Sequence, residues 1–163
     1  MAEKAAKPGN GLPMVRDCPS PNFNARALPV TMVVLHYTDM PDVEDAIAKM
    51  CDPDSGVSAH YCITRQGELV RLVDEEQRAW HAGVSYWRGN TDVNSSSIGI
   101  ELDNPGHTWG YERFTEPQME TLCIMLADIM KRHDIPRANI VGHSDVAPQR
   151  KTDPGELFDW ARL

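Results

Sequence analysis

The side chains most capable of chemistry are concentrated in one loop near the end of the sequence. Residues 142–155 contain an imidazole, two carboxylates, a lysine and an arginine, between bounding glycines. Imidazole and carboxylate are the usual ligands of a catalytic zinc ion, which binds three protein groups and keeps a fourth position for water. A lysine beside such an ion can stabilise the oxyanion that forms when this water attacks a carbonyl group. These residue types favour metal-assisted hydrolysis.

Two more polar residues lie on segments that can deliver them to this loop. Residues 30–37 form a β-branched and apolar run, typical of a buried strand, and His36 stands near its end, where open α/β sheets place their sites. Residues 97–102 alternate like a strand, with Glu101 between two apolar residues. This carboxylate either points to solvent or is buried with a raised pKa, as suits a general base. The residues alone leave both alternatives open.

The ligands of such a metal site cannot be chosen from spacing. The six histidines form no H-E-x-x-H motif, so a zinc site must be assembled from distant segments. His36 and His143, each at the end of an expected strand, are the candidate imidazole ligands. Asp145 and Asp153 compete for the carboxylate position, and residue type does not decide between them.

Several other candidate residues have ordinary structural explanations. Lysine and arginine in a loop are typical of solvated surface charges as well as of catalytic groups. Lys151 and Arg150 therefore have both explanations. His133 ends an expected helix, where a cation interacts favourably with the helix dipole. His107, which follows Asn-Pro-Gly, is typical of a turn.

Composition and length indicate one globular domain. The chain has 163 residues, of which 41% are apolar and 25% charged, values that are usual for a soluble protein. The net charge of -8 argues against a nucleic-acid-binding surface, and no apolar run approaches the roughly 20 residues of a membrane span. Residues 1–13 lack the apolar stretch of a secretory signal, so we expect a cytoplasmic protein. Four cysteines without C-x-x-C spacing are expected to be free thiols.

The pattern of elements predicts an α/β fold, with a central mixed β-sheet packed by helices. We expect an irregular arm over residues 1–29 and a single catalytic domain over residues 30–163. Helices are expected after the N-cap Asp42 and from Thr115 to His133, the second with Met119, Leu122, Cys123, Leu126, Met130 and His133 on one side. Further expected elements are a hairpin over residues 58–73, a long functional loop over residues 74–97, a strand over residues 139–142 and a terminal helical turn over residues 157–163.

Several blocks of the sequence resemble one enzyme family. The blocks are Val33-Val34-Leu35-His36-Tyr37-Thr38, Val57-Ser58-Ala59-His60-Tyr61, Ala79-Trp80-His81-Ala82-Gly83, Ser97-Ile98-Gly99-Ile100-Glu101-Leu102 and residues 142–155. In this order they resemble the zinc-dependent N-acetylmuramoyl-L-alanine amidases of the AmpD and AmiD group, which share a fold with the peptidoglycan recognition proteins and the amidase-type phage lysozymes.

The resemblance implies a role for each residue of the site. His36, His143 and Asp153 are similar to the three zinc ligands of the family, Glu101 to its catalytic acid/base and Lys151 to the residue that stabilises the carbonyl oxygen in the transition state. Asp145 is then a support for the loop or for a ligand histidine. His60, Trp80 and His81 match positions of the family and are expected to be site-wall or structural residues, and the loop over residues 80–94, with residues 104–109, would line a groove for sugar and peptide. The candidate substrate-binding residues are His60, Trp80, His81, Tyr86, Trp87, Asn104 and Arg150.

The implied reaction is hydrolysis of the amide bond between N-acetylmuramic acid, or its 1,6-anhydro form, and L-alanine. Parts of the sequence are more similar to AmiD, but the absence of an export signal favours a recycling enzyme acting on small anhydro-muropeptides. Two alternatives come from other classes. One is a non-catalytic peptidoglycan-binding module, and the other is a structural zinc site closed by a fourth protein ligand.

Overall fold

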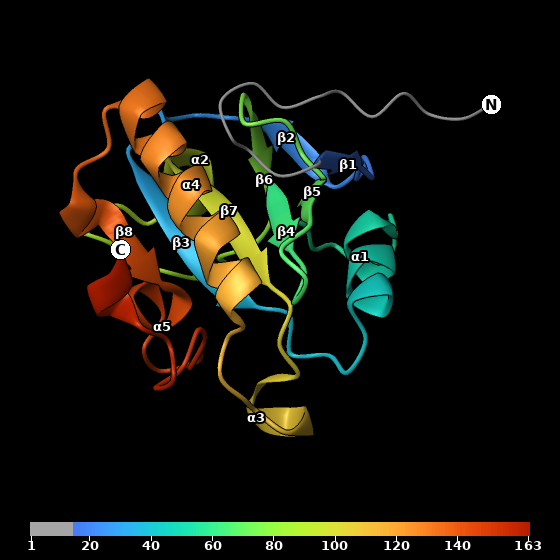
Figure 1. Ribbon diagram of the computed structural model, residues 1–163. Helices are drawn as coiled ribbons and strands as arrows, with labels where there is room; N and C mark the ends of the chain where they lie inside the picture. The colour runs from blue at the N-terminus through green and yellow to red at the C-terminus, as the bar shows by residue number, and fades with distance from the viewer. Residues whose placement is uncertain (1–14) are drawn as a thin grey trace.

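A mixed β-sheet forms the centre of the fold (Figure 1). The computed structural model describes residues 15–163. The six strands are, in spatial order, β1 (Val15–Asp17), β5 (Leu69–Arg71), β4 (Tyr61–Ile63), β7 (Ser97–Leu102), β3 (Met32–Tyr37) and β8 (Ile140–Gly142). Only β4 and β5 pair antiparallel within this sheet. A separate antiparallel pair joins β2 (Phe23–Ala25) to β6 (Gln77–Ala79).

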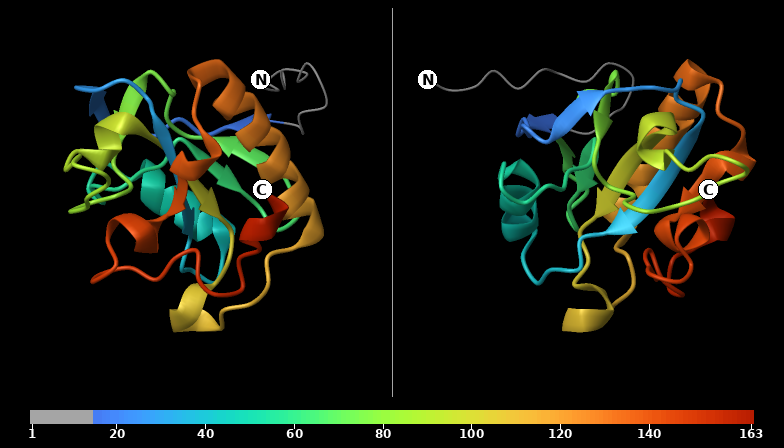
Figure 2. Two further views of the ribbon diagram at one scale, coloured as in Figure 1. Left: turned by 90° about the vertical axis from the view of Figure 1, so that its left-hand side faces the viewer. Right: turned by 180° about the vertical axis from the view of Figure 1, so that it is seen from behind.

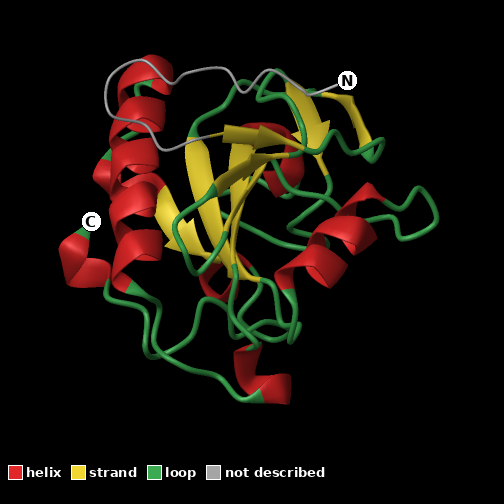
Figure 3. Ribbon diagram, turned by 45° about the vertical axis from the view of Figure 1, so that its right-hand side comes forward, coloured by secondary structure: helices red, strands yellow, loops and turns green. Residues whose placement is uncertain are grey.

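Helices cover both faces of the sheet. The longest, α4 (Glu116–His133), lies across one face, and α1 (Val43–Cys51) lies at the side of the sheet that contains β4 and β5 (Figures 1 and 3). The view from behind shows β3 in front of α4, with α2 on the near side of the sheet (Figure 2). The shorter elements are α2 (Val93–Ser96), α3 (Gly106–Trp109), α5 (His143–Val146) and the 3-10 turns η1 (Arg137–Asn139) and η2 (Trp160–Arg162).

The two central strands present different side chains to the two faces. Successive residues of a strand point to opposite sides. Ile98, Ile100 and Leu102 of β7 belong to the main apolar core together with the buried side of α4. On the opposite face β7 carries Ser97, Gly99 and Glu101. On the face that α4 does not cover, β7 therefore presents small and polar residues, whereas β3 presents Met32 and Val34 before His36.

The register of β3 and β7 brings two candidate site residues together. The strands are parallel and paired along their full lengths, with His36 opposite Glu101. Residues opposite each other in a sheet point to the same face, and neighbouring strands lie about 4.8 Å apart. His36 and Glu101 are therefore neighbours at the carboxyl ends of their strands.

The predicted helices are confirmed, with one change in the buried side of α4. Asp42 caps α1 through the backbone N–H groups of Glu44 and Asp45, and the Thr115 side chain accepts from the N–H of Gln118 at the start of α4. Cys123, Met130 and His133 are only partly buried, whereas Met125 and Ile129 are buried. The predicted stripe was thus placed too far to one side, because it omitted residues that also face the core.

The prediction of an irregular N-terminal arm is wrong for part of its length. Residues 1–14 lie outside the described residues, but β1 and β2 both fall within residues 15–29. These strands have three residues each and pair with β5 and β6, distant segments that local patterns do not reveal. The expected long loop over residues 74–97 likewise contains β6 and α2.

The remaining expectations about elements and cysteines agree with the structure. The hairpin is formed by β4 and β5, the last strand is β8, and a 3-10 turn lies within residues 157–163. The four cysteines, all within the described residues, form no disulfide, and Cys62 is buried. Among the described residues, no helix has the length and hydropathy needed to cross a membrane.

Candidate metal centre

Three potential ligand atoms converge beyond the carboxyl ends of β3 and β8. His36 is near the end of β3, His143 directly follows β8, and Asp153 lies in the loop after α5. Their side chains are buried, with exposures of 2%, 5% and 8%, respectively. The two Nδ1 atoms are 3.0 Å apart, and the Asp153 Oδ2 lies 3.1 Å from that of His36 and 3.2 Å from that of His143.

The size of this triangle fits a tetrahedral zinc ion. Ligand atoms about 2.0–2.1 Å from a tetrahedral centre lie about 3.3 Å from one another. The three observed separations, 3.0–3.2 Å, are close to that value. Among the described residues, these three side chains form the one group of His, Cys, Asp or Glu that meets the geometry of a metal site. A three-residue group leaves a fourth position, as catalytic zinc sites do.

The hydrogen bond of His143 to the backbone orients its ring toward the centre. Its Nε2 lies 2.9 Å from the carbonyl oxygen of Ala82. A carbonyl can only accept, so Nε2 carries the proton and donates it. In the neutral ring this leaves a lone pair on Nδ1, directed at the triangle. The donor set therefore has the chemistry that a divalent cation requires.

The charges of the centre follow from burial and from the neighbours. Burial, together with the nearby His143, lowers the pKa of His36 to about 4, so its ring is neutral at pH 7. Burial would raise the pKa of Asp153, but hydrogen bonds with His143 and His36 outweigh it and the pKa is lowered. A neutral imidazole and an ionised carboxylate are the forms that bind metal ions.

His81 stands behind His36. Its Nδ1 lies 2.9 Å from Nε2 of His36, and the two rings meet edge to face. Burial, then the neighbouring His36 and His60, lower the pKa of His81 well below its usual value, so this ring is also neutral.

Glu101 is partly buried and faces the cavity rather than the outer surface of the protein. Its side chain lines the same cavity as the triangle, and its Oε2 is buried with no hydrogen-bond partner among the described residues. Burial, and then the charge of Asp153, raise the pKa of Glu101 well above its usual value, while the charge of Lys151 opposes this rise. The structure thus decides between the two alternatives that the sequence left open.

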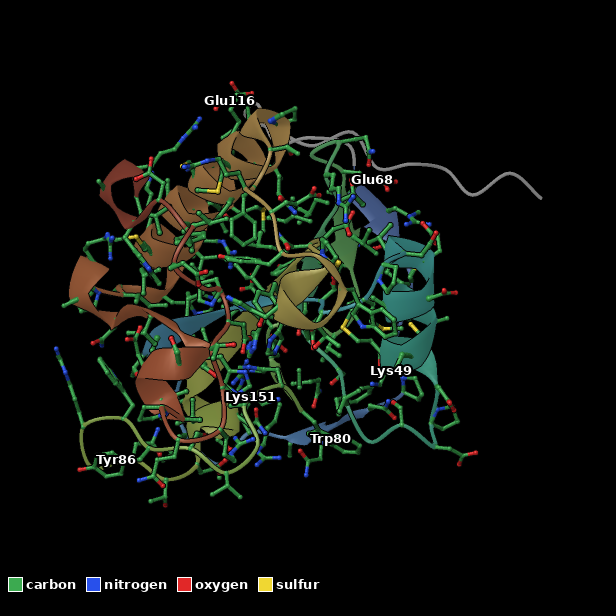
Figure 4. The ribbon with its side chains drawn as sticks, turned by 90° about the horizontal axis from the view of Figure 1, so that it is seen from below. Lys49, Glu68, Trp80, Tyr86, Glu116 and Lys151 are labelled. Atoms are coloured by element: carbon green, nitrogen blue, oxygen red, sulfur yellow. The ribbon has the colours of Figure 1, made fainter. Side chains whose placement is uncertain are left out.

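A cavity of about 410 Å³ opens over the triangle. Lys151 lies near the centre of the view from below, with Trp80 and Lys49 to one side of it (Figure 4). A second cavity of about 460 Å³ adjoins the first, because Trp80, His81, His143, Arg150 and Lys151 line both. The residues around the first cavity also include Tyr37, Asp39, Met50, Glu101, His107, Thr108 and Thr152.

Comparisons with known proteins agree with this geometry. The model of the N-acetylmuramoyl-L-alanine amidase family (Amidase_2) matches residues 26–156. The chain belongs to this family. It is 38% identical over 167 residues to the 1,6-anhydro-N-acetylmuramyl-L-alanine amidase AmpD of Enterobacter cloacae, covering 91% of this chain and 87% of that protein.

Two other matches extend the comparison. The chain is 40% identical over 146 residues to the N-acetylmuramoyl-L-alanine amidase AmiD of Escherichia coli, which covers 82% of this chain. It spans about half of AmiD, 52% of that protein. A crystal structure of a selenomethionine AmpD derivative superposes with a TM-score of 0.79 and 33% identity, covering 91% of each chain. The predicted α/β fold of this amidase family is confirmed.

Four of the residues predicted at the substrate do not line either cavity. His60 is fully buried, and its ring bonds to the N–H of Gly99 and the carbonyl of Gln77. Asn104 is buried and bonds to backbone groups of Gly106 and Glu112.

Tyr86 and Trp87 lie in the loop that precedes α2, away from the cavity walls. Trp87 is partly buried and packs against an apolar cluster on the face of the sheet opposite α4, whereas Tyr86 is exposed. The family blocks and the loop pattern do not separate structural positions from substrate-facing ones. Trp80, His81 and Arg150 line the cavities, and their contact with substrate stays a prediction.

The structure also assigns places to residues that the sequence left undecided or missed. Asp145 accepts from the N–H of Gly142 at 2.7 Å and so closes the first turn of α5, away from the triangle. His107, predicted as a turn residue, lines the cavity and bonds to the Tyr37 hydroxyl and to Glu156. The resemblance places residues 104–109, which include His107, along the groove, whereas residue type alone indicates only a turn.

Proposed function

We propose that this chain is a zinc-dependent N-acetylmuramoyl-L-alanine amidase of cell-wall recycling. Its reaction is hydrolysis of the amide bond between N-acetylmuramic acid, or its 1,6-anhydro form, and L-alanine in peptidoglycan fragments. The observation that carries the proposal is the triangle of two imidazole nitrogens and a carboxylate oxygen with sides of 3.0–3.2 Å in a chain of this family. The relative AmpD, a 1,6-anhydro-N-acetylmuramyl-L-alanine amidase that matches along 87% of its length, supports the anhydro substrate.

His36, His143 and Asp153 would hold the zinc ion. When bound there, zinc would supply the positive charge that polarises the amide carbonyl, activates water and favours the ionised form of a neighbouring carboxyl group. The burial of the three side chains supports this role, because a dry site strengthens electrostatic effects on the reacting atoms.

Glu101 would move the proton. It takes a proton from the water that attacks the amide carbonyl and returns it to the nitrogen of L-alanine as the C–N bond breaks. Its raised pKa suits this second step, because the carboxyl group keeps the proton until the leaving nitrogen accepts it. Lys151, at the same cavity, would donate a hydrogen bond to the carbonyl oxygen as negative charge develops there.

Substitution of Glu101 tests this assignment. Glu101→Gln removes the proton acceptor and keeps the size of the side chain, so we expect hydrolysis of anhydro-muropeptide to fall by about 100- to 10,000-fold. Zinc content should remain that of the wild type. Glu120→Gln, an exposed position on α4, is the matched control and should keep full activity.

The outcomes separate the proposed enzyme from its alternatives. A Glu101→Gln variant with near-normal turnover would exclude the acid/base role. A wild-type protein that binds zinc and muropeptide without hydrolysing it would favour the non-catalytic binding module. A fourth protein ligand on the zinc ion would favour a structural metal site.

The cytoplasmic location expected from the sequence stays a prediction. Fractionation of cells that express the native chain, with detection of the protein in each fraction, is the measurement that checks it. Comparison of anhydro-muropeptide with insoluble sacculi as substrates tests whether the enzyme acts on small fragments.

A further inference from the structure

A line of hydrogen bonds runs from the candidate ligand His36 into the protein. Its Nε2 lies 2.9 Å from Nδ1 of His81, whose Nε2 lies 3.1 Å from Oγ of Ser97. The Ser97 hydroxyl in turn lies 2.6 Å from the carbonyl oxygen of Val93. The line therefore crosses three side chains and ends at a backbone acceptor.

The end of this line fixes the direction of every bond in it. Ser97 has one hydroxyl proton, which goes to the Val93 carbonyl because a carbonyl can only accept. The Ser97 oxygen must then accept from Nε2–H of His81. A neutral imidazole carries one N–H, so Nδ1 of His81 is an acceptor and His36 must donate to it from Nε2. The remaining nitrogen of His36, Nδ1, is left with a lone pair at the triangle.

Gly99 provides the space in which the His81 ring lies. A Cβ atom built on Gly99 would collide with Cγ of His81 and stand 2.5 Å from its Cδ2, much closer than any real contact. Gly99 is on β7 between Ser97 and Glu101, on the face that carries the site. The sheet therefore has a gap that seats the imidazole within reach of both His36 and Ser97.

His143 is oriented in a different way. Its Nε2 donates to the backbone carbonyl of Ala82, which no side-chain substitution removes directly. Nε2 of His36 donates instead to the side chain of His81. Hydrogen bonds from the ring nitrogen that does not bind the metal fix the tautomer and direction of metal-binding histidines. His36 is consequently the ligand whose orientation depends on replaceable residues.

We propose that His81 is a positioning residue of the metal centre, seated by Gly99 and Ser97, which holds His36 in the tautomer that presents Nδ1 to the metal. The inference rests on the proposed role of His36 as a zinc ligand. It assigns no contact between His81 and the reacting atoms. Its expected consequence is a loss of zinc affinity when the line of hydrogen bonds is broken.

Zinc affinity, measured by competition with a chromophoric chelator, tests the proposal without reference to activity. His81→Leu fills much of the space but offers no acceptor, and we expect zinc affinity to fall by about 10- to 100-fold. His81→Gln restores an acceptor oxygen and should recover part of the loss. Equal affinities of His81→Leu and wild type would overturn the proposal, as would equal losses in both variants, which would indicate packing alone.

Ser97 offers a milder test with a matched control. Ser97→Ala removes the acceptor for Nε2–H of His81 and should weaken zinc binding. Ser95→Ala removes another buried hydroxyl, which accepts from the backbone N–H of Ala27 outside the line, and should leave zinc binding unchanged. Equal zinc affinities of the two variants would contradict the proposal.

Nitrogen NMR of the zinc-loaded wild type reads the tautomer itself. The proposal expects the proton of His81 on Nε2, and a proton on Nδ1 would overturn it. The result is distinguishable from failure of the proposed function. A wild-type chain that binds no zinc removes the metal centre, whereas a zinc-binding wild type with an unaffected His81→Leu removes only the positioning role.

Discussion

The two faces of β3 and β7 differ in what their side chains do. Toward α4, the strands present residues such as Leu35 and Ile100, which are fully buried in the main core. Toward the cavity, the same strands present His36 and Glu101, with a glycine between Glu101 and Ser97. One-residue steps along a strand therefore alternate between core packing and site chemistry.

This difference teaches that the reactive side chains lie on one side of the sheet only, although that side also holds two smaller apolar clusters. Burial of an aliphatic side chain contributes about 1.5–3 kcal/mol, and the α4 side holds many such residues. The cavity side instead contains neutral imidazoles, a carboxyl group with a raised pKa and a buried oxygen without a partner. Such groups are costly to bury and are useful for catalysis.

The largest expected effect is on the cavity side. Asp153→Ala removes one corner of the triangle, so we expect loss of bound zinc and a fall in turnover greater than the roughly 100- to 10,000-fold expected for an acid–base group alone. Metal analysis and the rate of muropeptide hydrolysis measure both. The exposed Asp54→Ala is the control, and an Asp153→Ala protein with full zinc content would break the assignment.

On the α4 side, a core truncation should act on stability alone. Leu122 is fully buried, so Leu122→Ala should lower the free energy of unfolding by about 2–5 kcal/mol through lost burial and the cavity it leaves. The folded variant should keep the zinc content of the wild type. Ile124→Ala, on the same helix at 40% exposure, should cost less, and denaturant unfolding compares the two. Equal losses of stability would contradict the stated arrangement of α4.

The pH dependence of stability should also come from the α4 side. Glu75 bonds to Arg132 and His133 at the end of α4 and to the Tyr61 hydroxyl. Burial opposes ionisation, but these bonds prevail and lower the pKa of Glu75 to about 2. Because the folded pKa is depressed, this stabilisation is present above the unfolded pKa of about 4.3 and is lost as pH falls toward 2.

Replacement of Glu75 should remove that part of the pH dependence. We expect the unfolding free energy of the wild type to fall by about 1–2 kcal/mol more than that of Glu75→Gln between pH 5 and about 2, allowing for the partial exposure of Arg132. Chemical unfolding at a series of pH values measures the difference. Parallel curves for the two proteins would show that Glu75 does not carry the effect.

The smallest expected effect is at the start of α4. Thr115→Ala removes the side chain that accepts from the N–H of Gln118 and should cost about 1 kcal/mol of stability. Thr115→Ser keeps the oxygen and should recover most of it. Thermal unfolding compares these variants, and equal melting temperatures for Ala and Ser would exclude the capping role.

The long, periodic elements could be predicted from the sequence. The helix over residues 116–133 has a capping residue and an apolar period, and the strand over residues 32–37 is a continuous apolar run. The strands β1, β2 and β6 could not be predicted, because each has three residues and forms by pairing with a distant segment. Local sequence patterns do not indicate which distant segment a short strand pairs with.

The candidate site shows a similar division. His36, His143 and Glu101 stand on or after recognisable strands, so their convergence could be expected from topology. The choice of Asp153 over Asp145 needed the family resemblance, and the structure adds a physical reason, since Asp145 bonds to the backbone of Gly142. His60 and Asn104 line neither cavity, and their burial depends on loops that the sequence does not position.

Anomalous diffraction at the zinc absorption edge, from crystals grown with zinc, tests the central claim most directly. The account predicts a single strong peak within about 2.0–2.2 Å of Nδ1 of His36, Nδ1 of His143 and a carboxylate oxygen of Asp153. A peak bound elsewhere, or no peak between these three residues at saturating zinc, would contradict it.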